Sequence, residues 1–410
     1  MKKRVLVGMT ALLLSISLLM AQEIPAGVIT AFKRGSSQEL SKYMGGKVNL
    51  VLQGRSTNVD KQKATAMMQD FFTENKVSGF NVNHQGKRDE SSFIIGTLAT
   101  TRGNFRVNCF LKKVENQYLI HQIRIDKSMN KEKELIDKLI DLAFAEDIGD
   151  GDHTTLSCIP ATAMGKSKLL IKEAGVLAGI EVAKEIFNRF DPTMKVEVFI
   201  NDGTEVEPGD VAMLVEGKVQ SLLQTERLML NVMQRMSGIA TMTRKYAKKL
   251  EGTRTHVLDT RKTTPGMRIL EKMAVKIGGG VNHRIGLFDM ILLKDNHVDF
   301  AGGIDKAITR AKEYCKEKGK DLKIEIEVRN FDELQQVLDL GGVDRIMFDN
   351  FTPEMTKKAV EMVAGKYETE SSGGITFDTL RDYAECGVDF ISVGALTHSV
   401  KGLDMSFKAC

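Results

Sequence analysis

Beyond Gly252, short apolar segments alternate with helical ones, and this alternation constrains the fold more than any other feature of the sequence. The predicted strands are residues 256–259, 290–293, 323–328, 345–348, 367–370 and 390–393. Helical periodicity separates most of them and covers residues 304–316, 331–340, 354–363 and 377–385. Such alternation implies a parallel sheet, and six units favour a barrel over an open sheet. We therefore predict an α/β barrel over residues 251–410.

A further α/β domain is predicted over residues 129–250, after a polar linker at residues 127–130. It begins with an amphipathic helix near residues 135–143 and a turn rich in Gly and Asp at residues 146–152. Strand-like runs follow at residues 168–172, 195–200 and 211–215. Helical sequence at residues 221–250 closes the domain.

The first 127 residues differ in character from the rest of the chain. Residues 1–21 resemble a secretory signal peptide, because a basic start precedes an apolar run that is short for a membrane span and ends at the small residue Ala21. A buried N-terminal helix is the alternative. Residues 22–127 predict a small α+β domain with a helix at 61–73 and an antiparallel meander from residue 93. This domain resembles the cone-shaped folds of the nuclear-transport-factor-2 type, and no catalytic constellation is found in it.

Composition narrows the class of function. The formal charge is only +4 over 410 residues, and basic runs with interleaved aromatic residues are absent from the sequence, so we expect no nucleic-acid binding. The five cysteines are scattered and form no CxxC pair, which fits reduced thiols better than a disulfide framework or a zinc site.

Cationic residues follow the first two predicted barrel strands, in the segments 260–266 and 278–284 and at the end of the strand 290–293. They are Arg261, Lys262, His283, Arg284 and Lys294. The carboxyl ends of barrel strands carry the chemistry of this fold class, and arginine matches a carboxylate bidentately. Any one of these residues alone is better explained as part of a surface salt bridge. Five together predict a pocket for a multiply charged anion.

Acidic and glycine-rich segments follow the later strands. Glu327 and Asp349 end neighbouring strands, where two carboxylates can hold Mg²⁺ or accept from sugar hydroxyls. Glu325 shares a face with Glu327, and we assign it a structural role because Glu327 lies nearer the carboxyl end. Segments 370–375 and 393–399 offer backbone N–H groups to a phosphate after the last two strands. Together these features describe a phosphorylated sugar that reacts with an acidic partner.

The motifs that carry this pattern resemble the quinolinate phosphoribosyltransferase family (nicotinate-nucleotide pyrophosphorylase, carboxylating). The matching segments are residues 146–155, 226–227, 259–266, 278–284, 293–297, 370–374 and 393–399. They extend from about residue 129 to residue 404 and appear in the family's order. The resemblance implies a type II phosphoribosyltransferase fold, in which an α/β sandwich-like domain precedes an incomplete six-stranded α/β barrel.

The resemblance also implies a reaction and a role for each site residue. Quinolinate and phosphoribosyl pyrophosphate (PRPP) would give nicotinate mononucleotide, pyrophosphate and CO₂, with Mg²⁺. Quinolinate would be bound by Arg261, His283, Arg284 and Lys294, together with Arg227 from a neighbouring subunit. Lys262 would contact pyrophosphate, and Glu327 and Asp349 would contact the ribose and the metal. A phosphate group would be bound by Ser372, Gly373, Gly394 and His398. A homodimer is then the smallest active unit.

Two rival functions stay open at the level of the sequence. One is a related phosphoribosyltransferase for another pyridine carboxylate such as nicotinate, although Arg284 and Lys294 provide a second carboxylate subsite that favours quinolinate. The other is an exported binding protein whose barrel still binds ligands but does not catalyse a reaction.

The signal-like N-terminus conflicts with an enzyme of cytosolic metabolites. Met129 resolves the conflict, since the residues that follow it read like the start of a complete enzyme. We hypothesise that two neighbouring reading frames are joined here. The catalytic part would then be cytoplasmic, and the segment 22–127 would be exported if it is made separately.

Overall fold

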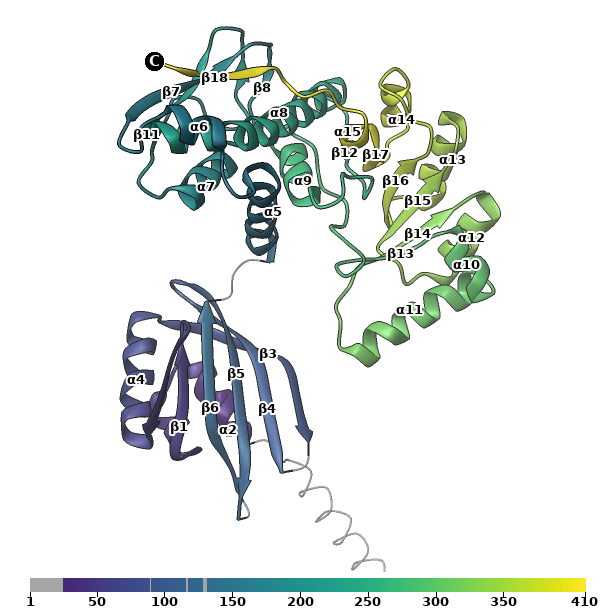
Figure 1. The fold of residues 1–410 in the computed structure, drawn as a ribbon. Coiled ribbons are helices and arrows are strands. Elements are labelled where there is room, and N and C mark those ends of the chain that lie inside the picture. The colour runs from purple at the N-terminus through teal and green to yellow at the C-terminus, as the bar shows by residue number, and fades with distance from the viewer. Residues whose placement is uncertain (1–24, 89, 116, 128–130) are drawn as a thin grey trace, which may run out of the picture. The chain divides into compact units, whose positions relative to one another are not determined.

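The computed structural model describes residues 25–88, 90–115, 117–127 and 131–410. The chain forms two compact units that divide between Glu134 and Leu135, and each has its own core (Figure 1). The predicted signal peptide and Met129 lie outside the described residues.

The first unit is a six-stranded sheet with helices packed on one face. Its strands lie in the order β2-β1-β6-β5-β4-β3, and every neighbouring pair is antiparallel except β1 with β6. They are β1 (Met44–Leu52), β2 (Arg55–Asp60), β3 (Val77–Arg88), β4 (Ser91–Thr100), β5 (Gly103–Val114) and β6 (Gln117–Lys127). The helices are α2 (Ala26–Arg34), α3 (Ser37–Ser41) and α4 (Lys61–Glu74). Apolar residues of α2 and α4 share a core with those of the sheet.

This unit is α+β, as the sequence predicted. The predicted helix and meander correspond to α4 and to β4, β5 and β6. In β4 every second residue is buried, which is the alternation that makes a half-buried strand recognisable. The strands β1, β2 and β3 were not predicted. Gly45 and Gly46 in β1 and the polar sequence of β3 lack that pattern.

The second unit begins with a four-stranded antiparallel sheet in the order β18-β7-β11-β9. These strands are β7 (Met164–Ile171), β9 (Lys195–Val198), β11 (Val211–Lys218) and β18 (Met405–Ala409). The pair β8 (Gly175–Val176) and β10 (Glu205–Val206) forms a small second sheet. The helices here are α5 (Lys131–Ile148), α6 (His153–Cys158), α7 (Ile180–Phe190) and α8 (Val219–Lys249). Figure 1 shows the yellow C-terminal strand β18 beside β7, a pairing that the sequence did not reveal.

The rest of the second unit is an open barrel of six parallel strands in the order β12-β17-β16-β15-β14-β13. They are β12 (His256–Leu258), β13 (Ile291–Leu293), β14 (Ile324–Val328), β15 (Arg345–Asp349), β16 (Glu368–Ser372) and β17 (Phe390–Ser392). All six coincide closely with the predicted strands. The incomplete barrel is confirmed, since β12 and β13 are the two ends of the strand order.

Helices follow each barrel strand in turn. They are α9 (Arg268–Ile277), α10 (Asp295–Ala301), α11 (Ile304–Lys318), α12 (Phe331–Leu340), α13 (Pro353–Val363), α14 (Leu380–Glu385) and α15 (Ala395–His398). Strand β14 is buried along its whole length, as expected of a parallel strand covered on both faces.

Strand register determines which side chains point toward the same face of the barrel sheet. Glu327 on β14 is opposite Met347 on β15, and Met347 is opposite Glu370 on β16. Asp349 and Ser372 are likewise opposite one another, two residues further along the same strands. Because side chains alternate along a strand, all five share one face, and their polar groups come together near its carboxyl edge.

Across the described part of the chain, every helix is too short or too polar to cross a lipid bilayer.

Candidate active site

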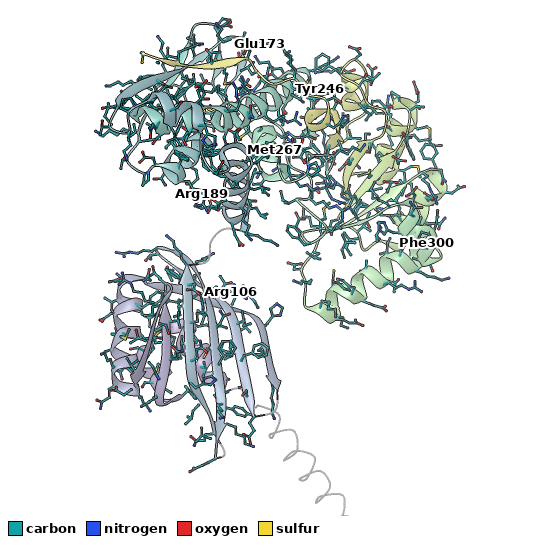
Figure 2. The ribbon with its side chains drawn as sticks, in the orientation of Figure 1. Arg106, Glu173, Arg189, Tyr246, Met267 and Phe300 are labelled. Atoms are coloured by element: carbon teal, nitrogen blue, oxygen red, sulfur yellow. The ribbon has the colours of Figure 1, made fainter. Side chains whose placement is uncertain are left out.

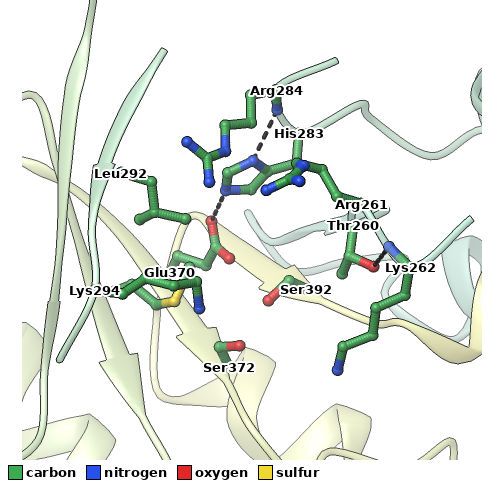
Figure 3. A pocket seen from close by; sticks show the side chains of 11 residues that line it. Thr260, Arg261, Lys262, His283, Arg284, Leu292, Lys294, Glu370, Ser372 and Ser392 are labelled. Carbon is green, nitrogen blue, oxygen red and sulfur yellow. Dashed lines mark hydrogen bonds and ion pairs between the residues drawn. The ribbon is translucent and has the colours of Figure 1, made fainter. Parts of the chain in front are cut away.

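A cavity of about 310 Å³ opens at the carboxyl ends of the barrel strands. Its cationic lining consists of Arg261, Lys262, His283, Arg284 and Lys294 (Figure 3). The other lining residues include Glu370, Ser372 and Ser392, together with the apolar side chains of Leu292 and Met347. The five cations singled out in the sequence therefore lie around one cavity.

Three loops bring these cations together. Arg261 and Lys262 lie in the loop after β12, and Lys294 directly follows β13. His283 and Arg284 lie in the loop after α9, where Val281 forms a parallel bridge with Leu258 of β12. Burial lowers the pKa of Arg284, and the nearby charge of Arg261 lowers it further. This mutual repulsion is relieved when an anion binds between the two residues.

A buried ion pair anchors the loop of His283. The side chains of Lys272 on α9 and Asp259 are 1% and 0% exposed, and the Lys272 ammonium donates to Asp259. Asp259 Oδ1 also accepts the backbone N–H of His283 at 2.9 Å, and Lys272 Nζ donates to the carbonyl of the same residue at 3.1 Å. Burial raises the pKa of Asp259 and lowers that of Lys272. The pair thus holds both backbone groups of one cavity residue.

Arg268, on the same helix, joins the two cationic loops. Its guanidinium donates to the carbonyl of Ile285 at 3.2 Å and to the Thr263 hydroxyl at 3.0 Å. A third, longer contact of 3.4 Å reaches the carbonyl of Arg261. This arginine therefore acts on the backbone, and it is not among the residues that line the cavity.

His283 contacts protein groups through both ring nitrogens. Nδ1 accepts the backbone N–H of Arg284 at 2.7 Å, and Nε2 lies 3.0 Å from Glu325 Oε2 and 3.5 Å from Glu370 Oε2. Burial opposes the imidazolium form, but the two carboxylates outweigh burial and raise the pKa of His283 to about 9. The hydrogen bond to Nδ1 favours the neutral ring instead. We favour the imidazolium on charge balance, since the single guanidinium of Arg345, 3.2 Å from Glu370, offsets only one buried carboxylate.

The side chains of His283, Glu325 and Glu370 also have the spacing of metal ligands. Atoms of His283, Glu325 and Glu370 lie within 4.8 Å of one another. Burial and the neighbouring Glu370 raise the pKa of Glu325 to about 7. Because Arg345 and the cavity cations surround the cluster, the arrangement favours a shared proton over a divalent cation. Glu325, expected to be a structural partner of Glu327, pairs with His283 in the structure.

Glu327 and Asp349 lie on the same face, but neither is among the residues that line the cavity. One oxygen of Glu327 is 2.9 Å from Lys294 Nζ, and Asp349 accepts the side-chain N–H of Asn350 at 2.8 Å. Two carboxylates from adjacent strands suit Mg²⁺, which is commonly held by one or two carboxylates together with substrate phosphates. The donor set therefore fits this ion.

The glycine-rich segments adjoin the cavity from the opposite strands. Ser372 lines it, and Gly373 has a φ of +94°, where a Cβ would lie 2.3 Å from Asn350 Oδ1. A side chain at Gly394 would come within 3.1 Å of both Lys262 and His398. The glycine therefore allows the last loop of the barrel to approach the first.

Arg227 differs from the other predicted site residues. It lies exposed on α8 and is not among the residues that line the cavity of its own chain. An exposed arginine in this position has to act outside the described cavity if it acts on a substrate.

The architecture and the cavity define an α/β-barrel enzyme of the type II phosphoribosyltransferase fold. Residues 239–408 match the model of the quinolinate phosphoribosyl transferase C-terminal domain, and residues 152–237 match that of its N-terminal domain. Together these matches cover more than half of the chain. The chain belongs to the quinolinate phosphoribosyltransferase family. Residues 25–126 match a separate family, described only as a domain of unknown function, DUF4783.

Individual relatives agree with this family. The decarboxylating quinolinate phosphoribosyltransferase 2b of Nicotiana tabacum is 42% identical over 286 residues, which are 66% of this chain and 81% of the relative. A probable nicotinate-nucleotide pyrophosphorylase of Bacillus subtilis is 40% identical, over 66% and 91% of the two chains. The crystal structure of NadC from Streptococcus pyogenes has a TM-score of 0.64 and 38% identity, covering 69% of this chain and 98% of that one.

Replacing Lys272 with Met should destabilise the fold in a pH-dependent way. Asp259 would stay buried without its cation, at a cost of about 3–5 kcal/mol near neutral pH. Because burial raises the pKa of Asp259, the folded state binds this proton more tightly than the unfolded chain. The penalty should be absent below the unfolded pKa of about 3.9 and should grow as the pH rises through the folded value.

Urea unfolding of the full chain at about pH 4.5 and about pH 8 measures this difference. The exposed Lys276 on the same helix provides the control, and Lys276→Met should leave stability nearly unchanged. Equal destabilisation of Lys272→Met at the two pH values would contradict the assignment.

Proposed function

We propose that this chain transfers the phosphoribosyl group of PRPP to quinolinate and removes one carboxylate as CO₂. The products are nicotinate mononucleotide and pyrophosphate, a reaction of de novo NAD biosynthesis. The observation that carries the proposal is the convergence of five cations on one cavity, beside two glycine-rich loops, in a chain of this family.

Quinolinate carries two carboxylates on adjacent ring carbons. We assign Arg261, Arg284 and Lys294 to them, because two guanidinium groups and an ammonium line the same cavity. His283, which the resemblance adds to this set, lies in the cavity wall with both ring nitrogens near protein groups. Its contribution is therefore the positive charge behind the carboxylates.

PRPP is assigned to the opposite side of the cavity. Ser372, Gly373, Gly394 and His398 would hold a phosphate group, and Lys262, next to Gly394, would contact pyrophosphate. Glu327 and Asp349 would accept from the ribose hydroxyls and hold Mg²⁺. When bound there, the ion would offset the negative charge of the departing pyrophosphate.

The reaction develops positive charge on the ribose carbon as pyrophosphate departs. The carboxylates of Glu327 and Asp349 stabilise that charge electrostatically. The pyridine nitrogen forms the new bond to the ribose carbon. Loss of CO₂ then leaves an electron pair on the ring carbon beside the quaternised nitrogen; the cations of the cavity stabilise it until a proton from water takes the place of the carboxylate. Holding the two reactants together supplies a large part of the rate acceleration.

Incubation of the full chain with quinolinate, PRPP and Mg²⁺ should yield nicotinate mononucleotide and one equivalent of CO₂. Nicotinate in place of quinolinate should give no product, and chelation of Mg²⁺ should abolish turnover. Glu327→Gln should lower kcat by about 10²-fold or more while quinolinate still binds. Product from nicotinate alone would favour the related transferase, and binding without turnover by the unaltered chain would favour a binding protein.

A homodimer, or a larger assembly, completes the site in our proposal. Arg227 is exposed on α8 and absent from its own cavity, so it is assigned to the cavity of a second copy. The exposed fork of a guanidinium is suited to a carboxylate that enters from outside.

Mixing two inactive variants tests this sharing. Arg227→Ala and Lys262→Ala chains should each lose most activity as homodimers. A mixed dimer keeps one intact site, so random mixing should restore about a quarter of the unaltered activity per chain. The unmixed variants at the same total concentration are the control. If mixing restores nothing, Arg227 serves its own chain.

The N-terminal segment is proposed to originate from a separate reading frame. The match to DUF4783 ends at residue 126 and the first transferase match begins at residue 152, with Met129 between them. Intact-mass measurement on the native protein should find two species, one of which begins at Met129. A single species that begins at Gln22 would refute separate production.

A further inference from the structure

An arginine of the long helix α8 lies at the junction of two cavity loops. The Arg235 side chain is 23% exposed, and Glu271 on α9, which it faces, is 0% exposed. Arg235 donates to Glu271 Oε1 through Nε at 3.1 Å and through a terminal nitrogen at 2.9 Å. A buried carboxylate requires such a partner, so the two side chains form one unit.

Glu271 extends this unit to the first cationic loop. Its second oxygen, Oε2, accepts the backbone N–H of Thr264 at 3.1 Å, two residues after Lys262. Arg235 also reaches the Thr264 hydroxyl at 3.4 Å. The loop that carries Arg261 and Lys262 is therefore hydrogen-bonded at Thr264 to both a carboxylate and a guanidinium.

Arg235 extends the same unit to the last loop of the barrel. It donates to the carbonyls of Thr397 and Val400, the latter at 3.2 Å. The Thr397 hydroxyl in turn donates to the carbonyl of Lys262 at 2.8 Å, which provides a second direct link between the loops. Thr397 adjoins His398 and is buried.

We propose that Arg235 and Glu271 are positioning residues that keep the phosphate-binding loop in register with the cationic loop. The inference rests on the proposed function, in which the loop from Gly394 to His398 holds PRPP and Arg261 holds quinolinate. Transfer requires the ribose carbon and the pyridine nitrogen to meet in one geometry, and a misplacement of about 1 Å can cost about 10²-fold in rate.

The chemistry of the guanidinium explains why an arginine occupies this position. Arginine presents five N–H donors in a rigid plane, and here they serve a carboxylate, a hydroxyl and two carbonyls from separate elements. A lysine ammonium has three donors and no fixed plane, so it cannot satisfy the same set.

Kinetics of Arg235→Met, Glu271→Gln and the double variant test the proposal in the full chain. Each single variant should lower kcat by about 10- to 100-fold, while the Kd of quinolinate alone changes by less than about threefold. The double variant should be little worse than the worse single variant, because the two residues act as a unit. Arg235→Lys should recover only part of kcat.

The matched control is Arg189→Met, near α5 (Figure 2). Arg189 also pairs with a carboxylate, Asp141 at 2.6 Å, but lies on α7 away from the cavity loops. Its kcat should stay within about twofold of the unaltered chain. If the Arg235 variants do not fold, Thr397→Val removes the second link without a buried charge, and Thr397→Ser should restore it.

The outcomes separate a failure of the proposed function from a failure of the positioning role. If the unaltered chain is inactive with quinolinate and PRPP, the proposed function fails. If it is active and both Arg235→Met and Thr397→Val keep full kcat, the positioning role is wrong. If these variants weaken quinolinate binding and stability in the same proportion as kcat, the network supports only the fold.

Discussion

Mutual repulsion among like charges is the constraint on which the second unit depends. Arg261, Arg284 and Lys294 cannot remain around one cavity unless other interactions hold their loops in place. The first turns of α9 supply those interactions through the side chains of Arg268, Glu271 and Lys272, each of which bonds to a loop. The cationic cavity is thus pre-formed, and an arriving dianion replaces repulsion with attraction.

The carboxylates at the barrel cavity fall into two groups by their contacts. Glu325 and Glu370 are fully buried and pair with His283 and Arg345, whereas Glu327 pairs with Lys294 and Asp349 accepts from Asn350. By strand register Glu370 is level with Glu327, whereas Glu325 lies two residues earlier on β14 and on the same face.

Local sequence patterns were sufficient for the parts of the fold that depend on local structure. The six barrel strands were predicted because they are apolar segments at regular intervals, and the cavity cations because they lie between the first two of these segments or just after the second. Lys272 and Glu271 were missed, since in sequence they look like ordinary charged residues of an amphipathic helix, and only tertiary packing buries them. Glu370 was read as part of a phosphate loop, and its contact with His283 joins segments that are distant in the chain.

Strand β18 makes the four-stranded sheet of the second unit discontinuous in the sequence. The last residues return to pair with β7, so the barrel is an insertion between β11 and the final strand of the other sheet. The barrel is a contiguous piece of polypeptide, whereas the four-stranded sheet is not. A fragment ending before the barrel would leave one edge of β7 without its hydrogen-bonding partner, exposed to pairing with other chains. The four-stranded sheet can therefore be completed only after the barrel has been synthesised. The pairing of β18 with β7 is then the final step in assembling a domain whose other strands precede the barrel in the chain.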